Sequence, residues 1–121
     1  MVSQNWVEYK IEIRERLLLF SLKILELSEQ LPKSVKSNVI NYQLTKSGTS
    51  MYANYRAALR GRSKAEFFSK LSIAVEEADE TEMWLDIAIA SKLVTNSSVK
   101  EIYDESLELI KILSSMRKKM N

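Results

Sequence analysis

The sequence predicts an all-α fold, an up-down-up-down antiparallel four-helix bundle, with residues 1–121 forming a single domain. The first observation is a scarcity of turn residues, since the 121 residues include only two glycines and one proline. A fold with many strands needs such residues at many turns, so their scarcity favours long helices. The second observation is apolar spacing, which repeats every three or four positions in four long segments. Because the breaks between these segments are short, consecutive helices are expected to run antiparallel.

The first helix is expected over about residues 8–29. Its apolar residues follow the spacing of one buried face, namely Ile13, Leu17, Phe20, Ile24 and Leu27. Four further apolar residues widen this face beyond a narrow seam, namely Ile11, Leu18, Leu22 and Leu25. Pro32 lies in the break that follows, where proline can open a helix but cannot continue one.

The second helix is expected over about residues 34–60 and has a smaller, more polar face. That face is predicted to contain Ile40, Leu44, Ser47, Met51, Asn54 and Ala58. Gly48 interrupts the helix, and glycine in a helix interior costs about 1 kcal/mol relative to alanine. Either the helix bends or breaks at Gly48, or another backbone packs closely there, and close packing is the favoured interpretation.

The third helix is expected from Lys64 to about Leu93. Gly61 is predicted to end the preceding helix in a left-handed conformation. Ser63 and Glu66 then form the Ser-x-x-Glu pattern of a capping box, which marks a helix start. The predicted buried face comprises Phe67, Leu71, Ala74, Ala78, Leu85 and Ala88.

The fourth helix is expected to reach about Lys119, after a loop at residues 95–98. Ser98 and Glu101 form a second capping box at its start. Its predicted buried face comprises Ile102, Leu109, Leu113 and Met116, with Tyr103, Leu107 and Ile110 beside it.

Composition argues against several classes of function. The chain has no cysteine for a nucleophile or thiolate site, and no histidine as general base or metal ligand. It also lacks a glycine-rich phosphate loop and any nucleophile motif, so we expect no enzyme, no metal and no cofactor. The longest uninterrupted apolar run, residues 17–20, is too short for a membrane span. We therefore expect a cytoplasmic protein that contacts no membrane.

Charge is unevenly distributed, although the formal net charge is only +2. No acid occurs between Glu29 and Glu66, and four cations in this region gather around Gly61. These candidate nucleic-acid-binding residues are Arg56, Arg60, Arg62 and Lys64. The cations of the C-terminal tail are expected at the same bundle end as the 30–34 turn, which would make both ends basic. Two interpretations fit the cluster around Gly61: a solvated turn with cations near helix C-termini, or a contact with phosphates.

Two neighbouring features bear on this choice. Pairing about Gly61 places Lys46 level with Glu77 and within one turn of Glu80, so these acids are expected to balance part of the basic helix. Exposed pairs of this kind contribute less than about 1 kcal/mol. Tyr52 and Tyr55 flank the basic stretch and either stack on bases or pack in the core or an interface, which is the commoner role of helical tyrosines.

Three segments are distinctive as a set: ANYRAAL (53–59), RSKAEFFSKLSIA (62–74) and EEADETEMWL (76–85). With these segments and LIKILSSMRKKM (109–120), the chain resembles the bacterial four helix bundle protein family, related to proteins encoded in intervening sequences of 23S rRNA genes. The resemblance implies a homopentameric barrel with a basic central channel. A related accessory variability protein of diversity-generating retroelements binds nucleic acid and its reverse transcriptase. Many members carry an acid after the arginine of NYR, and Ala57 at that position removes a local partner for Arg56.

The sequence therefore predicts a non-enzymatic homo-oligomer that binds RNA or DNA through the basic second helix and the turn after it. The excess apolar width of the first and fourth helices favours an oligomer, and the resemblance implies a pentamer. The alternative is a protein-interaction or scaffold module that docks a partner protein, such as a reverse transcriptase, without direct contact with nucleic acid.

Overall fold

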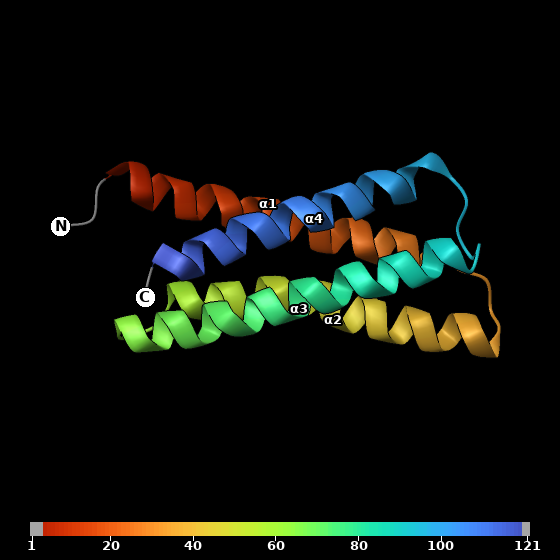
Figure 1. The fold of residues 1–121 in the computed structure, drawn as a ribbon, viewed down its shortest axis with the longest axis horizontal. Coiled ribbons are helices and arrows are strands. Elements are labelled where there is room, and N and C mark those ends of the chain that lie inside the picture. Colours follow the sequence, from red (N-terminus) through yellow and green to blue (C-terminus); the bar gives the residue numbers. More distant parts are fainter. Residues whose placement is uncertain (1–3, 120–121) are drawn as a thin grey trace.

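The computed structural model describes residues 4–119, which form four helices. These are α1 (Gln4–Gln30), α2 (Val35–Leu59), α3 (Lys64–Ala90) and α4 (Ser97–Lys119). They pack as an elongated up-down-up-down bundle in which α2 pairs most extensively with α3, and α1 least extensively with α4 (Figure 1). The predicted fold class is confirmed. Within residues 4–119, no helix has the length and apolar character that crossing a bilayer requires.

The predicted apolar faces form the core, with one exception on α2 and one on α3. All of the predicted central residues of α1 and α4 are buried. On α3, Phe67 is only half-buried and packs against the edge of the core. Asn54 is only half-buried, and its side chain donates to the Ser50 carbonyl, 2.9 Å away. Tyr55 occupies the core instead and is 0% exposed. Its hydroxyl donates to the Lys10 carbonyl of α1 at 2.7 Å, so a polar atom can be buried without losing its partner.

Gly48 lies inside an unbroken α2, so the helix does not break there. A Cβ at Gly48 would lie 3.0 Å from both Cγ1 and Cγ2 of Ile24 on α1. A neighbouring helix therefore packs closely at Gly48, but the expectation of a close backbone is wrong, because the nearest atoms belong to the Ile24 side chain.

The predicted start of α3 at Lys64 and end of α4 at Lys119 are confirmed, and the other helix ends differ from the predictions by up to four residues. Pro32 lies in the connection, and Ser34 caps α2 by accepting a hydrogen bond from the Ser37 N–H at 3.1 Å. The third helix ends at Ala90, three residues earlier than expected. Lys92 adopts a left-handed φ of 60°, and the two N–H groups that follow Ser91 turn back to the carbonyls of Ile89 and Ala88. This arrangement closes the helix without a glycine.

The start of α4 is also corrected. The helix begins at Ser97, so the capping residue is Asn96 and not Ser98. The Asn96 side-chain oxygen accepts from the Val99 N–H at 3.3 Å and from the Ser98 hydroxyl at 2.5 Å. The predicted Ser98–Glu101 capping box is therefore wrong. A cap must sit just before the first helical residue, and the chain enters the helix two residues earlier than the motif indicated.

Two polar contacts fix the register of neighbouring helices. Arg16 of α1 makes a forked ion pair with Glu105 of α4, with distances of 2.8 and 2.7 Å. The Thr81 hydroxyl of α3 donates to the buried Ser47 hydroxyl of α2 at 2.9 Å. The sequence patterns did not predict either pair, because each joins residues far apart in the chain.

Candidate nucleic-acid interface

The turn between α2 and α3 is held by backbone hydrogen bonds. The Arg60 N–H is shared between the carbonyls of Arg56 and Ala57, both 3.2 Å away, and the Gly61 N–H donates to Ala58 at 3.0 Å. Gly61 does not have a positive φ, so the predicted left-handed conformation is wrong. A glycine is instead required at this position because there is no space for a side chain. A Cβ would lie 3.1 Å from both the Ala58 oxygen and the Phe67 nitrogen.

Ser63 caps α3 as predicted, but only half of the capping box forms. The Ser63 hydroxyl accepts from the Glu66 N–H at 3.1 Å, with Ser63 in an extended conformation. The Glu66 carboxylate turns the other way and lies 3.6 Å from Nε of Arg62. Because the Arg62 side chain is 90% exposed, this ion pair neutralises little of its field.

The four predicted cations are brought together at this corner of the bundle. Arg60, Arg62 and Lys64 are exposed, and Arg56 is half-buried with its guanidinium 5.5 Å from the centroid of the Tyr52 ring. Within residues 4–119, only Arg62 among these four lies within ion-pair distance of an acid. The corner therefore presents positive charge to solvent, with little internal neutralisation.

A broad recess of about 490 Å³ opens beside this corner. Its walls come from the last turns of α2 and the start of α3: Tyr52, Ala53, Arg56, Ala57, Arg60, Glu66 and Lys70. Lys70 adds a cation that the charge pattern had not grouped with the corner. It lies one turn after Glu66 on the same helix, and that spacing could have identified it.

The C-terminal cations are not where the sequence placed them. Arg117, Lys118 and Lys119 form the last turn of α4, which lies at the Gly61 end of the bundle and not at the 30–34 turn (Figure 1). The expectation of two basic ends is wrong, because an even number of antiparallel helices returns the chain to the end where α2 finishes. We call the resulting surface the basic end, made up of Arg56, Arg60, Arg62, Lys64, Arg117, Lys118 and Lys119.

The acids of α3 lie against the opposite half of α2. Lys46, Glu77 and Glu80 line one small recess, as their predicted level indicated. Burial raises the pKa of Glu77 above its ordinary value, nearby Glu80 raises it further, and Lys46 opposes the rise. Lys46 is therefore partly balanced by these acids. At the basic end, Glu66 pairs with Arg62, and the first turns of α1, which begin at this end, carry Glu8 and Glu12.

The three tyrosines of α2 have different surroundings. Tyr55 is in the core, so the interpretation that it stacks on bases is wrong. Tyr52 is half-buried and lies under Arg56. Tyr42, which the sequence reasoning did not single out, is 64% exposed, and the ammonium of Lys46 lies 6.0 Å from its ring centroid. Its position opposite the predicted buried face of the helix could have revealed this exposure.

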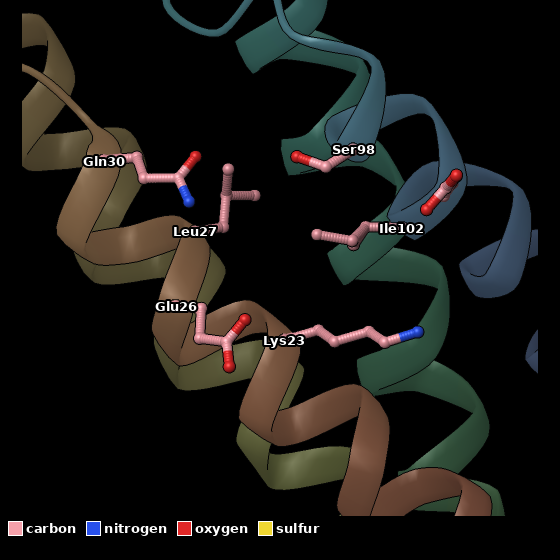
Figure 2. A pocket seen from close by; sticks show the side chains of 7 residues that line it. Lys23, Glu26, Leu27, Gln30, Ser98 and Ile102 are labelled. Carbon is pink, nitrogen blue, oxygen red and sulfur yellow. The ribbon is translucent and has the colours of Figure 1, made fainter.

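A smaller recess of about 130 Å³ lies between α1 and α4, at the other end of the bundle. Figure 2 shows Lys23 extending from α1 across it, with Gln30 and Leu27 pointing toward Ser98 of α4. Glu26 and Glu101 also line it, so its charge is mixed. Within residues 4–119, no cluster of three acidic side chains is placed to hold a metal ion.

Comparison with known proteins identifies the family. A family model described as the 23S rRNA-intervening sequence protein matches residues 9–115. The chain belongs to this family. A crystal structure of a protein of unknown function from the S23 ribosomal protein family of Bacteroides thetaiotaomicron is similar, with 36% identity and a TM-score of 0.82. The match covers 90% of this chain and 97% of the other. No curated protein matches the chain.

Family membership gives the corner a wider context. The segments at residues 53–59 and 62–74, which carried the resemblance to this family, form the end of α2, the Gly61 turn and the first half of α3. Two of the three distinctive segments therefore supply Arg56, Arg62 and Lys64 of the basic end. In this member, Ala57 lies in the wall of the recess with Arg56, and Glu66 is the carboxylate that shares this wall.

Proposed function

We propose that the protein is a non-enzymatic homo-oligomer that binds RNA or DNA through its basic end. The observation that supports this most is the meeting of the Gly61 corner with the last turn of α4 at one end of the bundle (Figure 1). Guanidinium and ammonium groups that are not neutralised within the protein are suited to phosphate, and each phosphate contact releases counterions. The proposal of a non-enzymatic role depends on the sequence, which has neither histidine nor cysteine.

The oligomer is supported by an exposed apolar ridge on α1. Ile11, Leu18, Leu22 and Leu25 are between 36% and 48% exposed, although the sequence pattern had counted them as part of a wide buried face. Apolar side chains that recur along one helix side favour an interface with another protein surface. A second copy of the chain would cover the ridge, and a ring would repeat the basic end around its axis. The resemblance to the family makes five the proposed number of subunits.

Sedimentation tests the oligomer. Replacing Leu18 and Leu22 with glutamate should release subunits at micromolar concentration, because two carboxylates would be buried in an apolar interface. The matched control Lys23→Glu adds negative charge on the side of α1 that faces α4 and should leave the mass unchanged. A wild-type monomer would refute the oligomer, whereas a dimer or tetramer would refute only the number five.

Salt-dependent binding tests the nucleic-acid contact. Arg60→Glu with Arg62→Glu should weaken binding to all oligonucleotides and reduce the slope of log K against log salt by about one per lost contact. Lys33→Glu with Lys36→Glu is the matched control, because it makes the same charge change at the other bundle end. Equal binding by both variants would refute the assignment. The exposed α1 ridge would then favour the alternative of a scaffold that docks a partner protein.

A further inference from the structure

The outward side of α2 carries a continuous set of polar, aromatic and cationic residues. We call it the α2 stripe, and it consists of Asn38, Tyr42, Thr45, Lys46, Thr49, Tyr52, Arg56 and Arg60. These positions recur at helical spacing beside the buried residues of α2, and Tyr52, which is half-buried, also packs against the core. The stripe contains no acid. We propose that it binds single-stranded nucleic acid, with bases stacking on Tyr42 and Tyr52; this inference rests on the proposed function and adds the class of strand.

Two tyrosine–cation pairs repeat along the stripe. Lys46 follows Tyr42 by four positions, and its ammonium lies 6.0 Å from the ring centroid. Arg56 follows Tyr52 by four positions, and its guanidinium lies 5.5 Å from that ring. Each pair places a positive charge over one face of an aromatic ring. A nucleotide needs both, since its base stacks on aromatic rings while its phosphate pairs with a cation.

Both rings border open space. Around Tyr42 is a recess of about 400 Å³, and around Tyr52 is the recess of about 490 Å³ beside the corner. Thr45, Thr49, Ala53 and Ala57 provide this space, because they are short side chains between the larger ones. Tyr42 itself is 64% exposed, which is unusual for an aromatic ring and leaves its surface available.

The polar groups near Tyr42 are mostly occupied. Asn41 donates to the Ser28 carbonyl at 2.9 Å, and the Thr45 hydroxyl donates to the Asn41 side-chain oxygen at 3.0 Å. The Thr49 hydroxyl donates to the Thr45 carbonyl at 2.8 Å. Groups already engaged within the protein are poorly placed to read base edges. Stacking with little sequence preference is therefore the expected mode of binding.

The spacing of the rings fits a short strand. Ten residues separate Tyr42 from Tyr52, which corresponds to about 15 Å along a helix. That length spans about four nucleotides at the roughly 3.4 Å spacing of stacked bases. Beyond Tyr52 the stripe continues through Arg56 to Arg60, so a strand on it would run into the basic end. The bases of a duplex are already stacked on one another, so a duplex would contact only the cations.

The test compares fluorescence anisotropy of a labelled single-stranded oligonucleotide and of its duplex. Tyr42→Leu should weaken single-strand binding about fivefold or more and leave duplex binding unchanged. Tyr42→Phe keeps the ring and should bind like the wild type. Tyr9→Leu removes a tyrosine of α1 outside the stripe and is the matched control. Because Tyr52 is half-buried, Tyr52→Leu could also destabilise the fold, so its binding is interpreted only together with a thermal melt. The result for Tyr42→Leu decides the test.

The outcomes separate this inference from the proposed function. If Tyr42→Leu binds single strands like the wild type while Arg60→Glu with Arg62→Glu loses binding, the stripe is refuted and the basic end stands. If neither change affects binding, both are refuted. If Tyr42→Leu changes the sedimenting mass, Tyr42 belongs to an interface between subunits and the stacking site is refuted. Selective loss of single-strand binding with an unchanged mass supports the stripe.

Discussion

Replacing Gly48 with alanine sets two energies of similar size against each other. Alanine favours a helix interior by about 1 kcal/mol over glycine. Against this, the new Cβ would lie 3.0 Å from both Cγ atoms of Ile24, well inside the ordinary carbon contact distance of about 3.5–4.0 Å. Inserting a carbon into a filled core costs typically about 1–3 kcal/mol.

The clash should prevail because Ile24 cannot move aside. Ile24 is 0% exposed and β-branched, so its χ1 angle is stiff. The two Cγ atoms lie equally close to the new Cβ, and a rotation that withdraws one drives the other toward it. We expect Gly48→Ala to lower the free energy of unfolding by about 1 kcal/mol.

A double-mutant cycle identifies the cause. Ile24→Ala removes both Cγ atoms, so adding Gly48→Ala to that background should raise the free energy of unfolding by up to about 1 kcal/mol. Ile24→Val keeps both Cγ atoms and removes only Cδ1, so Gly48→Ala should remain destabilising there. Urea unfolding followed by circular dichroism measures all the variants at one protein concentration, because association would shift the transition. A Gly48→Ala variant more stable than the wild type would refute the reasoning.

Two further predictions concern single hydroxyl groups. Ser63→Ala should lower the free energy of unfolding by about 1 kcal/mol in urea, since the Glu66 N–H loses its 3.1 Å partner, while Ser69→Ala on the exposed side of α3 should not. Burial raises the pKa of Tyr55 above its ordinary value, so the folded state resists losing a proton that the unfolded chain releases near pH 10. The free energy of unfolding of the wild type should therefore fall as the pH rises above about 10. Tyr55→Phe has no hydroxyl to ionise, so its free energy of unfolding should fall less over the same pH range in urea titrations. An unchanged alkaline decrease in Tyr55→Phe would contradict the assignment.

The helix faces were predictable because one rule, the helical repeat, decides them. The same rule could not choose between Asn54 and Tyr55, since both follow Met51 at an allowed spacing. Tertiary structure made the choice: the Tyr55 ring fills the core, and the Lys10 carbonyl accepts its hydroxyl. The α1 residues at the margin of the face, such as Leu22, were predicted as part of a wide face, and they remain exposed in the single chain.

Capping motifs were less reliable than periodicity, for a local reason. The motif at Ser63 identified the right cap, but Ser98 stands two residues after the residue that caps α4. Asn96 and Ser98 both have suitable side chains, and only the path of the chain out of the left-handed Lys92 decides which of them precedes the first helical turn. Gly61 shows a similar limit of sequence patterns. A glycine that is needed because a side chain would not fit cannot be told, from sequence, from a glycine that is needed for a positive φ.

The cations of the corner were found because they are close in sequence, whereas the tail cations were misplaced because they are not. In an antiparallel bundle each short connection reverses the chain, so α2 and α4 end where α1 and α3 begin (Figure 1). Counting reversals, without any chemistry, places Arg117 beside the Gly61 corner. Tyr42 was missed for another reason. It carries no charge, and only its position on the helix, opposite the predicted buried face, indicates that it is exposed.

The arrangement also bears on why the basic end exists. Helix dipoles favour cations at C-termini, which accounts for Arg56 in the last turn of α2 and for the three cations in the last turn of α4. The same dipoles disfavour cations at N-termini, yet Lys64 begins α3 and Arg62 precedes its cap. Glu66 is the one acid in that first turn, and its pair with Arg62 is too exposed to offset them. A solvated turn with dipole-stabilised cations therefore leaves Arg62 and Lys64 unexplained. A phosphate held at this end would account for both, because an anion at the start of α3 would be favoured by its N-terminal dipole and by these two side chains together.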